Sequence, residues 1–159
     1  MKIALCSLWT AITLGGIGGR SRRGGGSLRV IEVQDYDDLM DNSFPTFIIK
    51  GTNAKEVADN ISKNLEKVYE AFVRYCKRKN CFEPIRKDQN FCILSRHTAS
   101  IHILQHPKGP YRNYREGLYY VFKQYKLFKH NRLLGGTFPR KASPLLIGVL
   151  KTEAGYFIK

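Results

Sequence analysis

The sequence predicts an α+β fold, in which short strands alternate with helices. Residues 54–79 repeat apolar side chains at three- and four-residue steps, which is typical of an amphipathic helix. Shorter segments such as 27–33 alternate apolar and polar residues, which is typical of strands. Clusters of glycine and proline separate the two kinds of segment. Mixed periodicity of this kind excludes an all-helical or an all-strand fold.

The first third of the chain predicts one helix and two strands. Residues 4–14 are apolar almost all round, so we expect a buried helix that ends at Gly15 and Gly16, which suit a left-handed cap. A loop rich in glycine and arginine follows at 18–26, and then a strand is expected over 27–33. An acidic turn at 35–43 leads to a second expected strand over 44–50.

The remaining elements complete the order. A long helix is predicted over 54–79, with Thr52 or Asn53 as its cap and an apolar face made of Val57, Ile61, Leu65, Val68, Phe72 and Cys76. A strand is expected over 91–104, a loop over 105–115, a helix over 116–129, and a hairpin of 143–150 with 156–158 around Ala154 and Gly155. This order favours a ferredoxin-like antiparallel sheet with helices on one face, as a single domain over 1–159.

The charge points to a polyanionic partner, because the formal net charge is +14. Residues 1–30 carry five Lys or Arg and no acid, residues 31–70 four basic and nine acidic residues, and residues 71–159 eighteen basic and four acidic residues. The acidic middle block would repel phosphate, so one face is expected to bind nucleic acid and another is not. The alternative is a basic surface that only keeps the protein soluble.

The four cysteines and the apolar run at the beginning of the chain indicate in which cellular compartment the protein is expected. Cys6, Cys76, Cys81 and Cys92 match no small disulfide scaffold, so we expect reduced thiols and a cytoplasmic protein. The apolar run at 3–14 is shorter than the roughly 20 residues that cross a bilayer, and no membrane partner is expected. A secretory signal remains an alternative, which the arginines after this run disfavour.

The segment 15–27 carries the main candidate site. Its glycines let backbone N–H groups approach an anion, and its arginines can bind phosphate oxygens in pairs. The candidate RNA-binding residues here are Gly15, Gly16, Gly18, Arg20, Arg22, Arg23, Gly24, Gly26 and Ser27. A nucleotide-binding P-loop is excluded, because no Gly-Lys-Ser/Thr ending is present and the loop leaves a helix instead of entering one. A flexible linker with incidental arginines is the alternative.

Together with Arg140-Lys141-Ala142-Ser143-Pro144-Leu145, this loop resembles the first RAMP subunit of the Cmr-type (type III-B) CRISPR effector complex. In that family a helix ends in a loop of the kind Gly-Gly-x-Gly-x-Arg-x-Arg-Arg-Gly-x-Gly-Ser, and a basic residue shortly precedes Ala-Ser-Pro-Leu on a later strand. This chain matches that register and departs from it at Gly19 and Gly25. The resemblance covers the carboxy-terminal portion of the family, whose members contain two ferredoxin-like RAMP units, so it implies that the family's amino-terminal unit is missing from this sequence.

The resemblance implies a non-catalytic role in antiviral defence, without a cofactor or metal. The subunit would bind guide RNA near its 3′ end and single-stranded target RNA, next to other RAMP subunits or a separate chain that supplies the missing half. Arg140 and Lys141 would add to the RNA-binding residues. Charge and aromatic stacking support secondary contacts from Lys108, Arg112, Arg115, Lys123, Lys126, Lys129 and Arg132, interleaved with Tyr111, Tyr114, Tyr119, Tyr120 and Tyr125. For each tyrosine, the alternative is a position in the core.

Other functions remain as alternatives. A RAMP-fold endoribonuclease that processes guide RNA would use a histidine as general acid or base, from His97, His102, His106 and His130. A generic basic RNA-binding protein is a third hypothesis. A zinc site of Cys76, Cys81, Cys92 and His97 is disfavoured because close Cys-x-x-Cys pairs are absent. The acidic residues 35–38 are interpreted as a solvated turn or as a contact for a basic partner.

Overall fold

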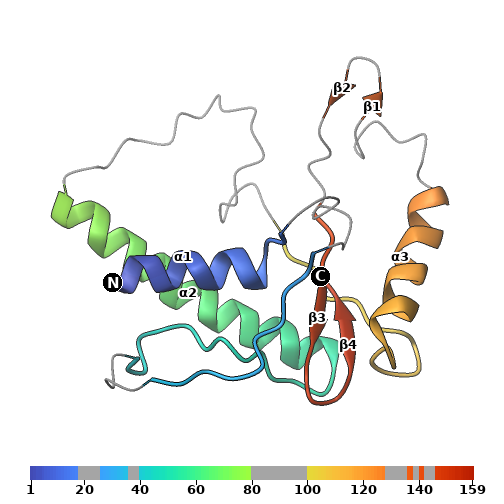
Figure 1. The fold of residues 1–159 in the computed structure, drawn as a ribbon, viewed down its shortest axis with the longest axis horizontal. Helices are drawn as coiled ribbons and strands as arrows, with labels where there is room; N and C mark the ends of the chain where they lie inside the picture. The colour runs from blue at the N-terminus through green and yellow to red at the C-terminus, as the bar shows by residue number, and fades with distance from the viewer. Residues whose placement is uncertain (18–25, 36–39, 80–99, 128–135, 138–139, 142–145) are drawn as a thin grey trace.

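The computed structural model of the chain describes residues 1–17, 26–35, 40–79, 100–127, 136–137, 140–141 and 146–159 (Figure 1). Its helices are α1 (Lys2–Thr13), α2 (Ala54–Lys79) and α3 (Tyr114–Leu127). Its strands form two antiparallel pairs, β1 (Gly136–Thr137) with β2 (Arg140–Lys141) and β3 (Val149–Lys151) with β4 (Tyr156–Ile158). The predicted α+β class is confirmed. The described ladders are two-stranded, and a larger ferredoxin-like sheet is not among them.

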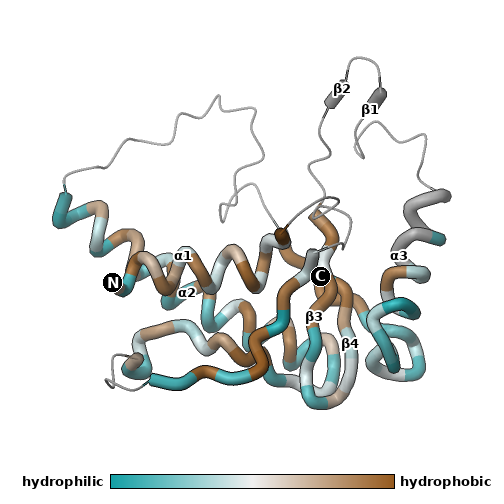
Figure 2. The backbone as a smooth tube through the Cα atoms, viewed as in Figure 1, coloured by the Kyte–Doolittle hydropathy of each residue, from teal (hydrophilic) through white to brown (hydrophobic). Residues whose placement is uncertain are grey.

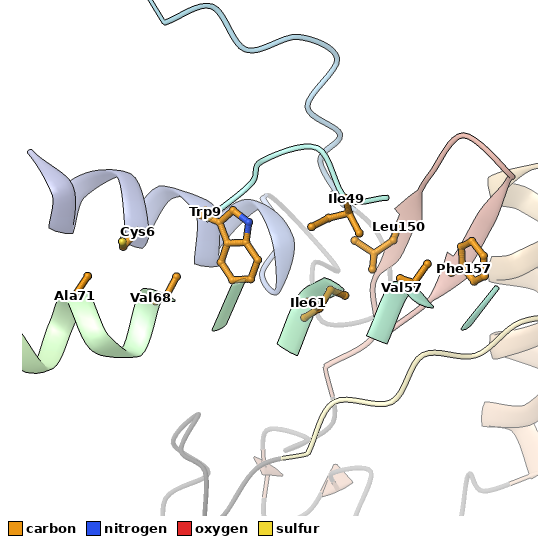
Figure 3. Close-up of a cluster of buried hydrophobic side chains, with 9 residues drawn as sticks. All are labelled: Cys6, Trp9, Ile49, Val57, Ile61, Val68, Ala71, Leu150 and Phe157. Atoms are coloured by element: carbon orange, nitrogen blue, oxygen red, sulfur yellow. The ribbon is translucent and has the colours of Figure 1, made fainter. Parts of the chain in front are cut away.

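The main core lies between α1, α2 and the β3–β4 hairpin. Figure 3 shows Cys6 and Trp9 of α1 directed at the side of α2 that carries Val68 and Ala71. The same cluster continues along α2 to Leu150 and Phe157 of the hairpin. Trp9 and Phe157 are 0% exposed, so two large aromatic rings are fully buried in this cluster. Burial of this apolar surface is what holds the helices on the hairpin.

The predicted helix at the amino-terminal end is present as α1, but it is not buried all round. Cys6, Trp9 and Thr13 face the core, whereas Leu8 is 49% exposed on the opposite side. Burial raises the pKa of the Cys6 thiol, and nearby Lys2 partly opposes that shift. At the carboxy-terminal end of α1, the Lys159 amine donates a hydrogen bond to the Thr13 carbonyl oxygen. Burial of this amine lowers the pKa of Lys159 to about 8.

Helix α2 has the predicted bounds, and its amino-terminal end is capped as the sequence indicated. The Asn53 side-chain oxygen accepts a hydrogen bond from the Glu56 N–H at 3.0 Å. The Glu56 carboxylate reaches back and accepts from the Thr52 N–H and hydroxyl, both at 2.7 Å, and these bonds lower the pKa of Glu56. Asn53 thus satisfies one backbone donor that the first turn of a helix leaves unpaired, and Glu56 holds Thr52, the residue before the cap, as in a capping box shifted by one residue.

The apolar face of α2 is covered over only part of its length. Val57, Ile61 and Val68 are buried, in agreement with the predicted stripe. Phe72, nearer the carboxy-terminal end, is 36% exposed. The buried polar Asn64 lies on the same face, where periodicity of apolar residues gave no sign of it.

The strand predicted over 44–50 is wrong, because side chains of the helices bind its backbone. The Trp9 indole N–H donates to the Thr46 carbonyl oxygen at 3.0 Å, and the Asn64 side-chain oxygen accepts from the Thr46 N–H at 2.7 Å. The Lys67 amine donates to the Phe44 carbonyl oxygen at 3.1 Å. With these groups occupied, the segment forms no ladder and bends at positions 44, 47 and 48.

The strand predicted over 27–33 is also wrong. Its residues are outside any strand, and Figure 2 shows hydrophobic and hydrophilic positions alternating along it beside β3. Among the apolar positions of this pattern, Leu28 is 39% and Val33 40% exposed and Val30 is half-buried, and none of them belongs to a core cluster. Of the strand predicted over 91–104, residues 91–99 lie outside the described part, and Leu104 alone forms a bridge, to Ile158.

The predicted hairpin is confirmed in its second half. Strands β3 and β4 pair Val149 with Ile158 and Lys151 with Tyr156, and Gly155 adopts a φ of 151° in the turn. Tyr111 bridges to the other edge of β4, so this strand has neighbours on both sides. Residues 143–145 lie outside the described part.

Helix α3 begins at Tyr114, two residues before the predicted start. The Asn113 side-chain oxygen accepts a hydrogen bond from the Glu116 N–H at 2.9 Å, which identifies Asn113 as the cap. Gly117 then allows α3 to approach the hairpin, because a Cβ atom there would lie 2.8 Å from a methyl carbon of Ile158. A second core cluster of Tyr111, Val149 and Ile158 forms at this contact.

Candidate nucleic-acid interface

The base of the predicted glycine-rich loop is closed by a backbone hydrogen bond. The Ile17 N–H donates to the Gly26 carbonyl oxygen at 2.9 Å. Gly26 has a φ of 73°, and a Cβ atom there would lie 1.7 Å from the Ile17 carbonyl oxygen. Glycine is therefore required at position 26 for the two ends to meet. The predicted contacts Gly18, Arg20, Arg22, Arg23 and Gly24 lie outside the described residues.

The glycines at the end of α1 act differently from the prediction. The helix ends at Leu14 in a right-handed conformation, and Gly15 and Gly16 are not among the glycines with positive φ. Gly15 matters for close packing instead, because a Cβ atom there would lie 2.5 Å from the Ala11 carbonyl oxygen. The left-handed cap is thus wrong, and Gly15 lets the chain turn tightly off the last turn of α1.

Ser27, the last residue of the candidate loop, is attached to the hairpin. Its hydroxyl oxygen accepts a hydrogen bond from the Val149 N–H at 2.9 Å. A cavity of about 350 Å³ opens beside this bond, between the segment after the loop, the start of α3 and the hairpin. Its lining consists of Gly26, Ser27, Leu28, Arg29, Tyr114, Leu118, Val149, Lys151 and Tyr156.

The cavity combines positive charge with aromatic rings. Its lining contains two basic residues, Arg29 and Lys151, and no acidic residue. The Lys151 amine lies 4.5 Å from the centre of the Tyr156 ring, which is a cation–π distance. Tyr114, another lining residue, is 49% exposed, so part of its ring is accessible to solvent. Such a site can bind a phosphate and a planar base next to each other.

A further cation, Arg115, lies beside the lining residue Tyr114. The Arg115 guanidinium is centred 5.9 Å from the Tyr114 ring and its Nε donates to the Tyr114 hydroxyl at 3.3 Å. That hydrogen bond raises the pKa of Arg115, and an arginine guanidinium is charged at ordinary pH values in any case. The positive charge beside the exposed ring is therefore permanent.

The structure gathers some of the predicted residues at this cavity and leaves others away from it. Gly26, Ser27 and Tyr114 line it. Arg140 and Lys141 form β2, paired with β1, and are not among the lining residues. Figure 1 shows the β1–β2 pair away from the β3–β4 hairpin.

The secondary contacts divide between surface and core. Tyr111 is 1% exposed and belongs to the core, so its prediction as a contact is wrong, whereas Tyr119 is 70% exposed. Tyr120 is partly buried against the second cluster. The exposed cations are Lys108, Arg112, Arg115 and Lys123. The side chains of Tyr125 and Lys126, and residues Lys129 and Arg132, lie outside the described part.

Three residues of the cavity were missed by sequence reasoning. Arg29 was interpreted only as the polar position of a strand, although it follows the loop directly. Lys151 and Tyr156 are directly opposite each other in the hairpin, whereas the first strand of the predicted hairpin ended at residue 150 and left Lys151 out. A cation opposite an aromatic residue in a hairpin beside a glycine-rich loop is the signal that would have found them.

Among the described residues, no group of side chains forms a site for the alternative functions, a histidine-dependent ribonuclease or a zinc-binding protein. The His102 ring nitrogen lies 3.1 Å from the Ser100 hydroxyl, and a His106 ring nitrogen accepts from the Lys108 N–H at 3.2 Å; neither histidine lines the cavity. In the described part of the chain, no three histidine, cysteine or acidic side chains gather as metal ligands. His97, His130, Cys81 and Cys92 lie outside it.

The acidic stretch forms local hydrogen bonds where it is described. An Asp35 carboxylate oxygen accepts from the Met40 N–H at 2.6 Å. Asp41 accepts from the hydroxyl and the N–H of Ser43, and these bonds lower the pKa of Asp41. Such local bonds are typical of a turn, as interpreted from the sequence.

Comparison with known protein families, curated proteins and solved structures finds no match to this chain. Of the helices in the described part, none combines the length and the apolar character that crossing a membrane requires.

Proposed function

We propose that the chain is a non-catalytic RNA-binding subunit of a type III-B CRISPR ribonucleoprotein, with a ferredoxin-like RAMP fold. It binds guide or target RNA through the glycine-rich loop and the cavity beside Ser27. The observation that carries the proposal is this cavity, where the end of the loop meets Arg29, Lys151 and two tyrosines. The sequence motifs supply the CRISPR part of the proposal, and the cavity supports the RNA part.

Binding uses two kinds of interaction in this scheme. The guanidinium groups of Arg20, Arg22 and Arg23 contact phosphates along the loop, and Arg29 and Lys151 continue the positive surface into the cavity. The exposed Tyr114 ring stacks on an unpaired base, an interaction that tolerates any sequence and suits a guide that varies. Neither interaction needs a proton transfer, so no catalytic residue is required.

A generic solubilising role fits the charge less well. An acid-free cavity with rings in its lining does not arise from the need for solubility, which is served by mixed charges spread over a surface. None of the nine acidic residues between positions 31 and 70 is among the residues that line the cavity.

The test is binding of a fluorescein-labelled single-stranded RNA to the purified chain, followed by fluorescence anisotropy at several salt concentrations. Changing Arg20, Arg22 and Arg23 together to glutamine removes three phosphate contacts. The slope of log affinity against log salt is then expected to fall by about 2, since each contact on a single strand contributes about 0.7. Tyr114→Ala is expected to weaken binding by about 1–3 kcal/mol with little change in that slope.

Lys63→Gln is the matched control, because Lys63 is an exposed cation on α2 away from the cavity. RNA affinity that responds equally to Lys63→Gln and to the arginine variant would contradict the site. Cleavage of the RNA, abolished by a histidine substitution, would favour the endoribonuclease instead. Co-purification from the native cell with small RNA and other RAMP subunits tests the assignment to the complex.

A further inference from the structure

Strand β3 has one edge that β4 does not cover. Gly148 and Lys159 exchange both backbone hydrogen bonds, at 3.0 Å each, and the Thr152 N–H donates to the Gly155 carbonyl oxygen at 2.9 Å. Since paired residues alternate along an antiparallel ladder, the backbone groups of Val149 and Lys151 point away from β4. The Val149 N–H is bound by the Ser27 hydroxyl, which leaves the Lys151 amide facing the open side.

Two segments flank this open edge without pairing to it: residues 28–33 are extended, and residues 47–50 bend at Phe47 and Ile48. Within the described part of the chain, the backbone of residues 28–33 and of residues 47–50 makes no hydrogen bond. Figure 1 shows the first of these segments passing beside β3. Extended backbone with unpaired N–H and C=O groups next to a sheet edge is a template for another strand.

A groove of about 170 Å³ lies between the two segments and β3. Apolar side chains form much of its wall, among them Ile12, Leu28, Ile31, Phe47, Ile48 and Leu150. Ile31 is 81% exposed and Ile48 39% exposed, so apolar surface at the groove faces solvent. The sequence of 27–33 has the alternation of a strand, and the backbone of residues 28–33 forms no hydrogen bond in the described structure.

The charged residues of the groove select its occupant. Arg29, Lys50 and Lys151 line it, against one acid, Glu153. We infer that the groove binds an extended segment of a partner protein, in which apolar residues alternate with carboxylates. The apolar residues fill the groove, the carboxylates meet the three cations, and the backbone pairs with the open edge of β3.

Protein fits this groove better than RNA or a second copy of the chain. The wall is aliphatic and carries one aromatic residue, Phe47, whereas unpaired bases bind to stacked rings. A nucleic acid also cannot continue a ladder of backbone amides. A second copy with its net charge of +14 would bring further positive charge to the cations of the groove.

The test uses the full chain and a fluorescein-labelled peptide with blocked ends, about eight residues long, in which valine alternates with glutamate. Binding is measured by fluorescence anisotropy. Replacing glutamate by lysine in the peptide is expected to weaken binding at least about tenfold, because like charges then meet. Methylating alternate backbone nitrogens, on the side that faces β3, is expected to weaken it about as much, because those N–H donors are lost.

Lys50 separates this inference from the proposed RNA site, because it lines the groove and not the cavity beside Ser27. Lys50→Glu is expected to weaken the glutamate peptide about tenfold and to leave RNA affinity unchanged, and Lys63→Glu on α2 serves as the matched control. Equal binding of the lysine or methylated peptides, or no binding of the glutamate peptide at about 1 mM, overturns the inference. Displacement of the peptide by RNA, with RNA affinity lowered by Lys50→Glu, would assign the groove to RNA and also overturn it.

Discussion

Tyr111 is buried in a way that predicts a stabilising substitution. It is 1% exposed, and its hydroxyl has no hydrogen-bond partner among the described residues. The ring packs against Tyr120 at a centroid distance of 5.8 Å and against His106 at 6.2 Å. Its backbone exchanges hydrogen bonds with Tyr156 at 2.8 and 2.9 Å. The ring and the backbone are therefore well placed, and the hydroxyl alone is unsatisfied.

Tyr111→Phe keeps these contacts and removes only the hydroxyl. Burying a hydroxyl without a partner costs about 1–3 kcal/mol in proteins. We expect the substitution to raise the free energy of unfolding by about 1 kcal/mol, and the melting temperature by roughly 2–4 °C for a chain of this size. Urea denaturation followed by circular dichroism, together with a thermal scan, measures both quantities.

Tyr119→Phe is the control, because Tyr119 is 70% exposed and its hydroxyl is already hydrated. It should leave stability within about 0.5 kcal/mol of the unsubstituted chain. A second readout comes from titration, because burial, with smaller contributions from Tyr120 and Glu116, raises the pKa of Tyr111 to about 12. The ultraviolet titration of Tyr111→Phe should lack this late tyrosine. If Tyr111→Phe instead unfolds at a lower urea concentration, the hydroxyl has a partner and the reasoning fails.

Three further predictions concern the cap of α2, its buried amide and the buried amine. Asn53→Ala removes the acceptor for the Glu56 N–H and should lower the free energy of unfolding by about 1 kcal/mol, while Asn53→Ser loses less; equal urea midpoints for both would contradict the cap. Asn64→Ala leaves the Thr46 N–H without its acceptor and should cost about 2–3 kcal/mol by the same measurement, whereas a loss under 0.5 kcal/mol would show that the bond is dispensable. Lys159 has a pKa of about 8 in the folded state and of about 10.5 in the unfolded state. Below pH 8 the amine is charged in both states, and burying this charge lowers the free energy of unfolding by the full amount. As the pH rises from 8 to about 10.5, the folded state loses the charge and this penalty disappears. The stability of the chain relative to Lys159→Met should thus rise by on the order of 2 kcal/mol between pH 7 and pH 10.5, and a difference independent of pH would refute the assignment.

Local patterns account for the elements that were predicted well. Helix α2 follows from a periodicity of apolar residues and from the Asn53 and Glu56 cap, which are all encoded within one segment. The hairpin follows from alternation on each side of Gly155, whose φ of 151° favours glycine. Gly26 and Ser27 could be placed at the candidate site because glycine and arginine concentrate around them.

Contacts between distant segments account for what differed. The segment 44–50 has the pattern of a strand, but Trp9 and Asn64, 37 and 18 residues away from Thr46, bind its backbone. The cavity joins residues 26–29 with Tyr114 and with the hairpin residue Lys151, and no local pattern specifies that meeting. The spacing of apolar residues indicates which side of a helix or strand is apolar, so it was enough to predict the helices and the hairpin. Which backbone groups are left for pairing, and which side chains share a cavity, depends on how those elements pack, because hydrogen bonds and burial are set by distances in space and not along the chain.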